Sequence, residues 1–145
     1  MAWHEDDWPR NRWPNFSYRE LVCSQSGINK MCEDTMDRLQ EVRTAYGRGL
    51  TISSGYRDVT HSIEAAKIAK RVAAGKSATG GAHTTGRAVD LAVRGADAVH
   101  LLSLALDAGF TGIGVQQAGE KRFIHLDDIQ PEDDFHASRP WIWSY

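Results

Sequence analysis

Two short segments hold the side chains that most restrict how this chain of 145 residues can fold. The first, residues 81–90, contains His83 and ends at Asp90, and the second, residues 123–127, contains His125. Two imidazoles and one carboxylate are a donor set that catalytic zinc sites use, with the fourth position left to a water whose pKa the metal lowers towards neutrality. The sequence therefore predicts a fold that brings these three side chains together around one Zn²⁺ ion, as in a metallohydrolase.

The local sequence favours such a convergence. Side chains alternate along a strand, so His125 and Asp127 are expected to point to the same face, with their apolar neighbours facing the core. Gly86 lies between His83 and Asp90 and allows the backbone to fold back closely enough for both to reach one ion.

Composition indicates one soluble globular domain. Its hydrophobic share of 41% and charged share of 25% are ordinary, and the length suits a single core. A formal charge of -2 gives no indication of a nucleic-acid partner, and the cluster Lys67, Lys70 and Arg71 is expected to be a solvated helix face. The longest apolar runs are too short to span a bilayer, so no membrane insertion is expected. A monomer is expected, although no sequence feature indicates the oligomeric state.

The first twelve residues and the two cysteines bear on where the protein works. Residues 1–12 are polar and lack the apolar run of a signal peptide, so synthesis in the (host) cytoplasm without an export signal is expected. Cys23 and Cys32 are nine residues apart, which fits neither a zinc knuckle nor a disulfide framework. Two buried thiols are expected, and a single disulfide stays open as the alternative.

The pattern of apolar residues predicts a mixed set of helices and strands. Residues 1–16 are expected to form an irregular N-terminal arm, and residues 17–145 a single domain, with Ser17 as the N-cap of a short helix that Glu20 completes as a capping box. The remaining expected elements are helices at 28–46, 63–73 and 97–108, strands at 50–53 and 88–93, a hairpin of strands at 112–115 and 123–126, and an irregular tail at 131–145. The helix at 97–108 is apolar nearly all round, which predicts a buried central helix. The expected class is α+β, with a small, mainly antiparallel sheet, a buried helix and flanking helices.

Three segments carry a resemblance to a known family. Residues 54–57 (Ser-Gly-Tyr-Arg), 83–90 and 123–127 closely resemble the zinc peptidases of the D-Ala-D-Ala carboxypeptidase and L-alanyl-D-glutamate endopeptidase group. That group includes the vancomycin-resistance dipeptidases and many phage endolysins, and it shares its fold with hedgehog signalling domains. The resemblance runs from about Phe16 to the Arg-Pro-Trp sequence at 139–141.

The resemblance implies roles for individual residues. By position, His83, Asp90 and His125 would be the zinc ligands, and Arg57 the cation that holds substrate and stabilises charge on the scissile carbonyl. A permanently charged, forked guanidinium suits that second role. The alternative for Arg57 is an ion pair with Asp58 or another carboxylate.

The general base is where the sequence departs from the family. Several members carry an acidic residue three positions before the second histidine, and here that position holds Arg122. Asp127 and Glu120 are the candidates, and Asp127 is favoured because the strand fixes its direction. The alternative for Asp127 is a carboxylate that orients a ligand histidine through its ring N–H.

Three further residues are candidates for binding substrate. Ser54 and Tyr56 belong to the Ser-Gly-Tyr-Arg turn and follow a short strand, so they either contact substrate or shape the turn. His61 follows the same turn and either lines the cleft or lies at the surface near a helix N-terminus.

The expected activity is zinc-dependent hydrolysis of an amide bond in the peptidoglycan stem peptide, in the manner of a phage endolysin acting in the periplasm or at the cell wall. The first alternative is a carboxypeptidase or dipeptidase that acts on D-Ala-D-Ala ends. The second is a non-catalytic zinc-binding module of the same fold, which Arg122 at the usual position of the base keeps open.

Overall fold

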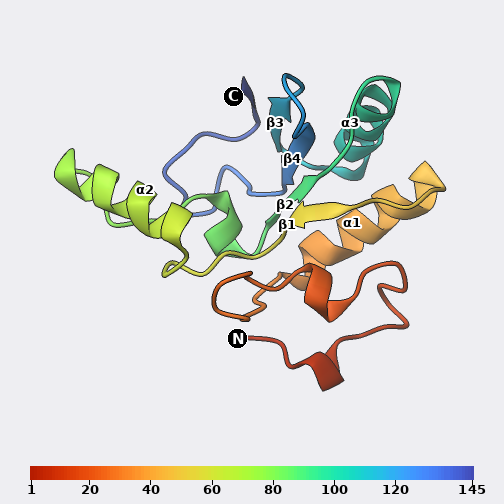
Figure 1. Cartoon of the computed structure of the whole chain (residues 1–145), viewed down its shortest axis with the longest axis horizontal. Helices are drawn as coiled ribbons and strands as arrows, with labels where there is room; N and C mark the ends of the chain where they lie inside the picture. Colours follow the sequence, from red (N-terminus) through yellow and green to blue (C-terminus); the bar gives the residue numbers. More distant parts are fainter.

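The computed structural model describes all residues of the chain, 1–145, and confirms the α+β class. Three α-helices and three short 3-10 helices surround one five-stranded sheet (Figure 1). The helices are α1 (Glu33–Tyr46), α2 (Ser62–Ala73) and α3 (Ala96–Ala108), and the 3-10 helices are η1 (Glu5–Asp7), η2 (Tyr18–Glu20) and η3 (Ala82–Thr85). The strands are β1 (Ile52–Ser54), β2 (Ala88–Leu91), β3 (Gly112–Gln116), β4 (Phe123–Asp127) and β5 (Trp141–Ser144).

The sheet has the order β1-β2-β4-β3-β5, and every pair is antiparallel except β3 with β5. The predicted hairpin is confirmed as β3 and β4. In the central pair, Val89 lies opposite Leu126 and Asp90 lies opposite His125. Val89 and Leu126 are part of the hydrophobic core, so the alternation of side chains puts Asp90 and His125 on the other face of the sheet.

Helix α1 begins five residues later than the apolar periodicity predicts. Ile28 to Cys32 form a segment without regular secondary structure instead, in which the Asn29 side chain accepts a hydrogen bond from the backbone N–H of Met31 at 3.0 Å. The helix ends as predicted, because Gly47 adopts the left-handed conformation, at φ 74°, that closes a helix.

The other two helices differ in their packing. Helix α3 packs against α1 but buries only one face, which contains Leu101, so the expectation of a helix buried on all sides is wrong. Val99 and Leu106 remain 71% and 56% exposed because nothing covers the outer side of α3. Helix α2 projects away from the sheet on the side opposite α1 and α3 (Figure 1).

The N-terminal segment packs onto α1 through three tryptophans. The rings of Trp3, Trp8 and Trp13 meet edge to face, with centroids 4.9 to 5.7 Å apart. Each indole N–H has an acceptor, and that of Trp13 is the carboxylate of Asp37 in α1, at 2.8 Å. Trp8 and Trp13 are therefore core residues in an otherwise irregular segment.

Ser17 forms the predicted N-cap. Its side chain accepts from the backbone N–H of Glu20, and the Glu20 carboxylate accepts from the backbone N–H of Ser17, so the capping box is confirmed. The helix that follows is a single 3-10 turn.

The irregular tail predicted for residues 131–145 contains a strand. Residues Trp141 to Ser144 form β5, which pairs with β3 at the edge of the sheet. Pro140 precedes this strand through a cis peptide bond. The two cysteines are free, with Cys23 buried and Cys32 partly buried. None of the helices combines the length and the hydropathy that spanning a bilayer requires.

Candidate metal centre

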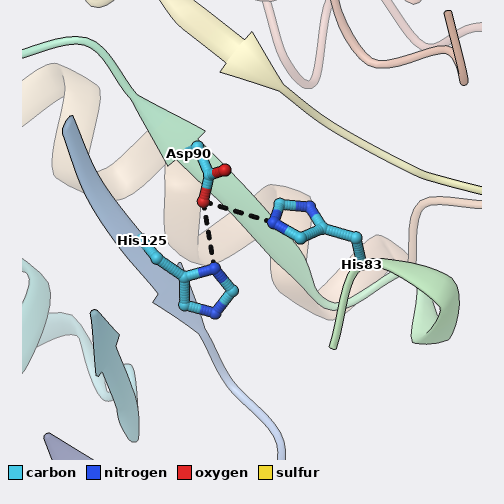
Figure 2. Close-up of side chains that lie close together, drawn as sticks. All are labelled: His83, Asp90 and His125. Atoms are coloured by element: carbon cyan, nitrogen blue, oxygen red, sulfur yellow. Dashed lines mark hydrogen bonds and ion pairs between the residues drawn. The ribbon is translucent and has the colours of Figure 1, made fainter. Parts of the chain in front are cut away.

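Three side chains from three different elements converge on one point of the sheet (Figure 2). His83 belongs to η3, Asp90 to the middle of β2 and His125 to the middle of β4. One ligand atom from each lies within 4.8 Å of the others, and all three residues are buried. The three predicted metal ligands are therefore brought together.

Hydrogen bonds fix which ring nitrogen of each histidine faces the centre. His83 Nδ1 lies 2.8 Å from the carbonyl oxygen of Gly55, and His125 Nε2 lies 2.8 Å from Oδ2 of Asp127. These acceptors require an N–H on those atoms, so the opposite nitrogens, His83 Nε2 and His125 Nδ1, carry lone pairs in the neutral rings. Both point at Oδ1 of Asp90, at 3.2 and 3.0 Å (Figure 2).

This arrangement fits a metal cation. Three electron-pair donors directed at one another in a buried site repel unless a cation lies among them. Ligand histidines usually donate their second N–H to a carbonyl or carboxylate, and both histidines here do so. The donor set of two imidazoles and a carboxylate is one that zinc accepts.

When no cation lies among the three groups, His83 and His125 can donate to Asp90 only in the imidazolium form, with an N–H on both ring nitrogens, and the shifts in their pKa values describe that competition for a proton. Burial lowers the pKa of His83, although the hydrogen bond to Asp90 opposes this effect. Burial alone would raise the pKa of Asp90, but hydrogen bonds from His125 and His83 outweigh it and hold that pKa far below its usual range. Burial would lower the pKa of His125, and its bonds to Asp127 and Asp90 reverse the direction.

A tight loop presents His83 beside β2. Gly86 adopts φ 75°, and a Cβ there would collide with the carbonyl oxygen of Lys30. The carbonyl of Gly86 accepts from the N–H of Cys32 at 2.8 Å, and the carbonyl of His83 accepts from the N–H of Arg57 at 3.1 Å. Glycine at position 86 is thus required both by the conformation and by the close approach of a second segment.

Asp127 is fully engaged by two partners. Its carboxylate receives two hydrogen bonds from the guanidinium of Arg139, both at 2.8 Å, in addition to the bond with His125. Burial would raise the pKa of Asp127, but Arg139 and His125 hold it below its usual value. The side chain is completely buried, and the absence of a side chain at Gly112 leaves the space that it fills. This geometry favours an orienting role for Asp127 over that of a base open to water.

Arg57 lies between the candidate centre and α2. Its Nη1 is 3.2 Å from the carboxylate of Glu64, and its Nη2 is 3.9 Å from Oδ2 of Asp90. Glu64 also accepts from the N–H of Gly81 at 2.8 Å, so one buried carboxylate holds both the arginine and the start of the His83 loop. Arg57 does form an ion pair, and that pair directs its guanidinium towards the site.

Three other candidates have contacts that bear on their predicted roles. Ser54 is half-buried on β1 opposite Asp90 and lines a small cavity together with Arg57. Tyr56 is a core residue whose hydroxyl bonds Asp58, and burial followed by that carboxylate raises its pKa to about 12.

His61 is buried and does not lie at the surface. Its Nδ1 accepts the N–H of Ile63 and caps α2. The side chains of Tyr56 and His61 therefore take part in structural contacts, with Asp58 and with the N-terminus of α2.

The turn between β3 and β4 lies beyond the centre of the site. Glu120 is exposed there and takes part in no hydrogen bond or ion pair, and Arg122 bonds the carbonyl of Gly119. Neither contacts the three converging side chains.

Sequence reasoning missed two residues that support the centre. Glu64 resembles an ordinary residue of an Ala- and Lys-rich helix, and no sequence signal indicates its burial. Arg139 belongs to the Arg-Pro-Trp tail of the resemblance, which implies no role for it.

Trp143 is a different case. From the sequence, Trp141 and Trp143 are expected either to cover the edge of the cleft or to close the domain by aromatic packing. The ring centroid of Trp143 lies 5.0 Å from that of His125. The alternation of aromatic residues at 141, 143 and 145 is a strand signal that could have placed this ring.

Buried donors that converge in this way from a loop and two adjacent strands are typical of metal-dependent hydrolases. A family model described as Peptidase M15 matches residues 14–127, which is most of the chain. The chain belongs to the Peptidase M15 family, which confirms the resemblance, and the family is one of zinc-dependent peptidases. Among curated proteins, none matches the chain.

Proposed function

We propose that this protein is a zinc-dependent peptidase that cuts an amide bond in the peptidoglycan stem peptide, in the manner of a phage endolysin during lysis of the host cell. The observation that carries the proposal is the convergence of His83, Asp90 and His125 with both second ring nitrogens already hydrogen-bonded. Family membership supports the peptidase class, and the substrate follows the resemblance to cell-wall peptidases.

His83 Nε2, Asp90 Oδ1 and His125 Nδ1 would hold the metal. When bound, zinc activates a water and polarises the scissile carbonyl. Arg57 is 17% exposed at its side chain and is directed by Glu64, so it can reach a substrate carbonyl and stabilise the negative charge that develops there.

Asp127 acts in this proposal by orienting His125. It accepts the Nε2–H of His125, which leaves Nδ1 free to ligate, and Arg139 keeps Asp127 ionised. Arg139 lies outside the residues that the family model matches, so this support comes from the C-terminal part of the chain.

The test compares zinc-loaded protein, chelator-treated protein and two single variants on purified peptidoglycan. His83→Ala is expected to abolish both zinc binding and cleavage, and His100→Ala, an exposed histidine of α3, is expected to change neither. Full wall-lytic activity in His83→Ala would overturn the proposal.

The products separate the proposal from its alternatives. Mass spectrometry of digested muropeptides is expected to show new internal termini, whereas release of terminal D-Ala alone would indicate a carboxypeptidase. Bound zinc with no cleavage of any cell-wall substrate would favour the non-catalytic module, for which the exposed Arg122 at the usual position of the base is the supporting observation.

A further inference from the structure

A basic cavity lies beside the candidate metal centre. It has a volume of about 290 Å³ and is lined by the second half of α2, the loop that follows it, and His136. Four of its lining residues are cations, namely Lys67, Lys70, Arg71 and Lys76. The sequence alone suggested a solvated helix face for the first three, and the fold adds a concave surface and a fourth positive charge.

Carboxylates neutralise little of this charge. Lys67 lies 3.3 Å from Glu64, but that carboxylate is shared with Arg57. Arg71 donates from Nε and Nη2 to the carbonyl and hydroxyl oxygens of Ser77, at 3.1 and 2.9 Å, which fixes the guanidinium without neutralising it. Lys70 and Lys76 form no ion pair. The cavity therefore concentrates positive charge on a chain whose formal net charge is -2.

The remaining wall offers neutral hydrogen-bonding groups. Thr79 Oγ1 lies 3.2 Å from His136 Nδ1. Burial lowers the pKa of His136, and Arg71, Arg139 and Lys76 add to that effect, so the ring is neutral at pH 7. An anionic group in the cavity would meet several charged donors together with a hydroxyl and an imidazole, a combination that suits a carboxylate.

The cavity is close to the candidate metal centre. Gly81 lines it, and His83 is two residues further along the chain, so their Cα atoms are at most about 7 Å apart. Lys67 and Arg57 contact the same carboxylate of Glu64, which joins the cavity to the site. A peptide whose amide bond lies at the centre can thus extend a neighbouring residue into the cavity.

We propose that this cavity binds a free carboxylate of the stem peptide while the scissile amide lies beside His83, Asp90 and His125. The inference rests on the proposed function, because it assigns the cavity to the same substrate. A stem pentapeptide with L-Lys at the third position carries two free carboxylates, that of the γ-linked D-glutamate and that of the C-terminal D-Ala, and the experiment distinguishes them.

The experiment uses the zinc-loaded protein and three synthetic pentapeptides with the sequence L-Ala, γ-D-Glu, L-Lys, D-Ala, D-Ala. One keeps both carboxylates, one has the glutamate carboxylate amidated, and one has the terminal carboxylate amidated. The wild-type protein is expected to show a KM roughly tenfold higher for the peptide that lacks the bound carboxylate. Equal KM values for all three peptides would overturn the proposal.

Two exposed lysines provide the matched variants. Lys70→Glu in the cavity is expected to raise KM roughly tenfold for the diacid peptide and to remove the preference for the carboxylate. Lys121→Glu, in the turn between β3 and β4, makes the same charge change elsewhere and is expected to leave KM unchanged. An equal rise in KM for all peptides in Lys70→Glu would contradict a carboxylate site.

A binding measurement separates failure of this inference from failure of the proposed function. If the wild-type protein cleaves none of the peptides, the proposed function fails, and the diacid peptide is then titrated while the backbone amide resonances of residues 74–81 are followed by NMR. Shifts that disappear in Lys70→Glu would uphold the cavity as a carboxylate site, and the absence of shifts in the wild-type protein would overturn it.

Discussion

At the scale of single residues, Asp127 shows how one buried side chain can serve both the site and the fold. It joins His125 to Arg139, and the guanidinium of Arg139 is buried with it. Removing one member of such a group leaves the other as an uncompensated charge. The effects of substitution at Asp127 should therefore appear in metal affinity, activity and stability together.

Asp127→Asn is expected to lower both zinc affinity and kcat/KM by roughly 10- to 100-fold without abolishing either, because a carboxylate that only orients a ligand is not essential to the chemistry. Zinc affinity is measured by competition with a chelator, and activity by peptide cleavage. Glu120→Gln serves as the control and is expected to change neither. Complete loss of activity with unchanged zinc affinity would instead identify Asp127 as the base.

Glu64 provides a second test, through the dependence of stability on pH. Burial would raise its pKa, but the N–H of Gly81, Lys67 and Arg57 together hold it below the ordinary value of 4.5. Because the folded-state pKa is the lower one, the ionised carboxylate stabilises the fold above about pH 4.5, and this contribution is lost as pH falls through the folded-state pKa.

The Glu64→Gln variant isolates that contribution. The difference in free energy of unfolding between wild type and variant is expected to stay constant from about pH 7 to pH 5 and to shrink below about pH 4.5. Urea denaturation at several pH values measures it. A difference that does not change with pH would show that Glu64 contributes through packing alone.

At the scale of elements, the loop from η3 to β2 holds His83 and Asp90 in register. Gly86→Ala is expected to lower the free energy of unfolding by more than about 3 kcal/mol, since left-handed strain and a collision with the carbonyl of Lys30 add together. Gly47→Ala has nearly the same φ, 74°, with nothing near its Cβ, and is expected to cost only about 1 kcal/mol. Similar losses in the free energy of unfolding of the two variants would show that position 86 does not require glycine more strongly than position 47 does.

Sequence predicted those elements whose pattern is local. The β3–β4 hairpin and the ends of α1 and α3 at Gly47 and Gly109 follow from short-range signals of alternation and of glycine in the left-handed conformation. The predicted start of α1 is five residues too early, because Ile28, Met31 and Cys32 continue the helical spacing although they precede the helix. Met31 is buried there, and Ile28 and Cys32 are half-buried.

The sequence does not predict the elements that depend on partners distant in the chain. Strand β5 forms by pairing with β3, from which β4 and a long loop separate it along the chain. Gly114 leaves the space that the ring of Trp143 fills. The predicted burial of α3 on all sides is wrong for the same reason. Composition shows that Val99 and Leu106 are apolar, but not that their side of the helix has no partner.

The residues of the candidate site fall into the same two groups, those that a sequence pattern predicts and those that depend on partners distant in the chain. His83, Asp90 and His125 could be found because their residue types and spacing are chemically specific. Glu64 and Arg139 could not be found, because they join the site only through the tertiary fold. Glu64 does so when the loop at 74–81 brings the N–H of Gly81 to its carboxylate, and Arg139 when the C-terminal segment brings it to Asp127.

For the molecule as a whole, the proposed metal site would couple metal binding to stability. A metal that binds only the folded chain stabilises it by about 2.7 kcal/mol at a free concentration a hundredfold above Kd. For a domain of this size, the corresponding rise in Tm is roughly 5 to 10 °C. Zinc is therefore expected to raise the Tm of chelator-treated protein, as followed by circular dichroism. The same addition to Asp90→Asn is expected to give little change, and an equal rise in that variant would place the binding elsewhere.

The strand order carries a consequence for local motion. Asp90 and His125 lie directly opposite each other on β2 and β4, and each of these strands has a neighbour on its other side. Opening of a sheet starts at its outer strands, so backbone amides at the centre exchange with deuterated solvent only in rare, extensive openings. These two positions should retain their protons longer than β1 or β5, so Asp90 and His125 would stay opposite each other while the outer strands open.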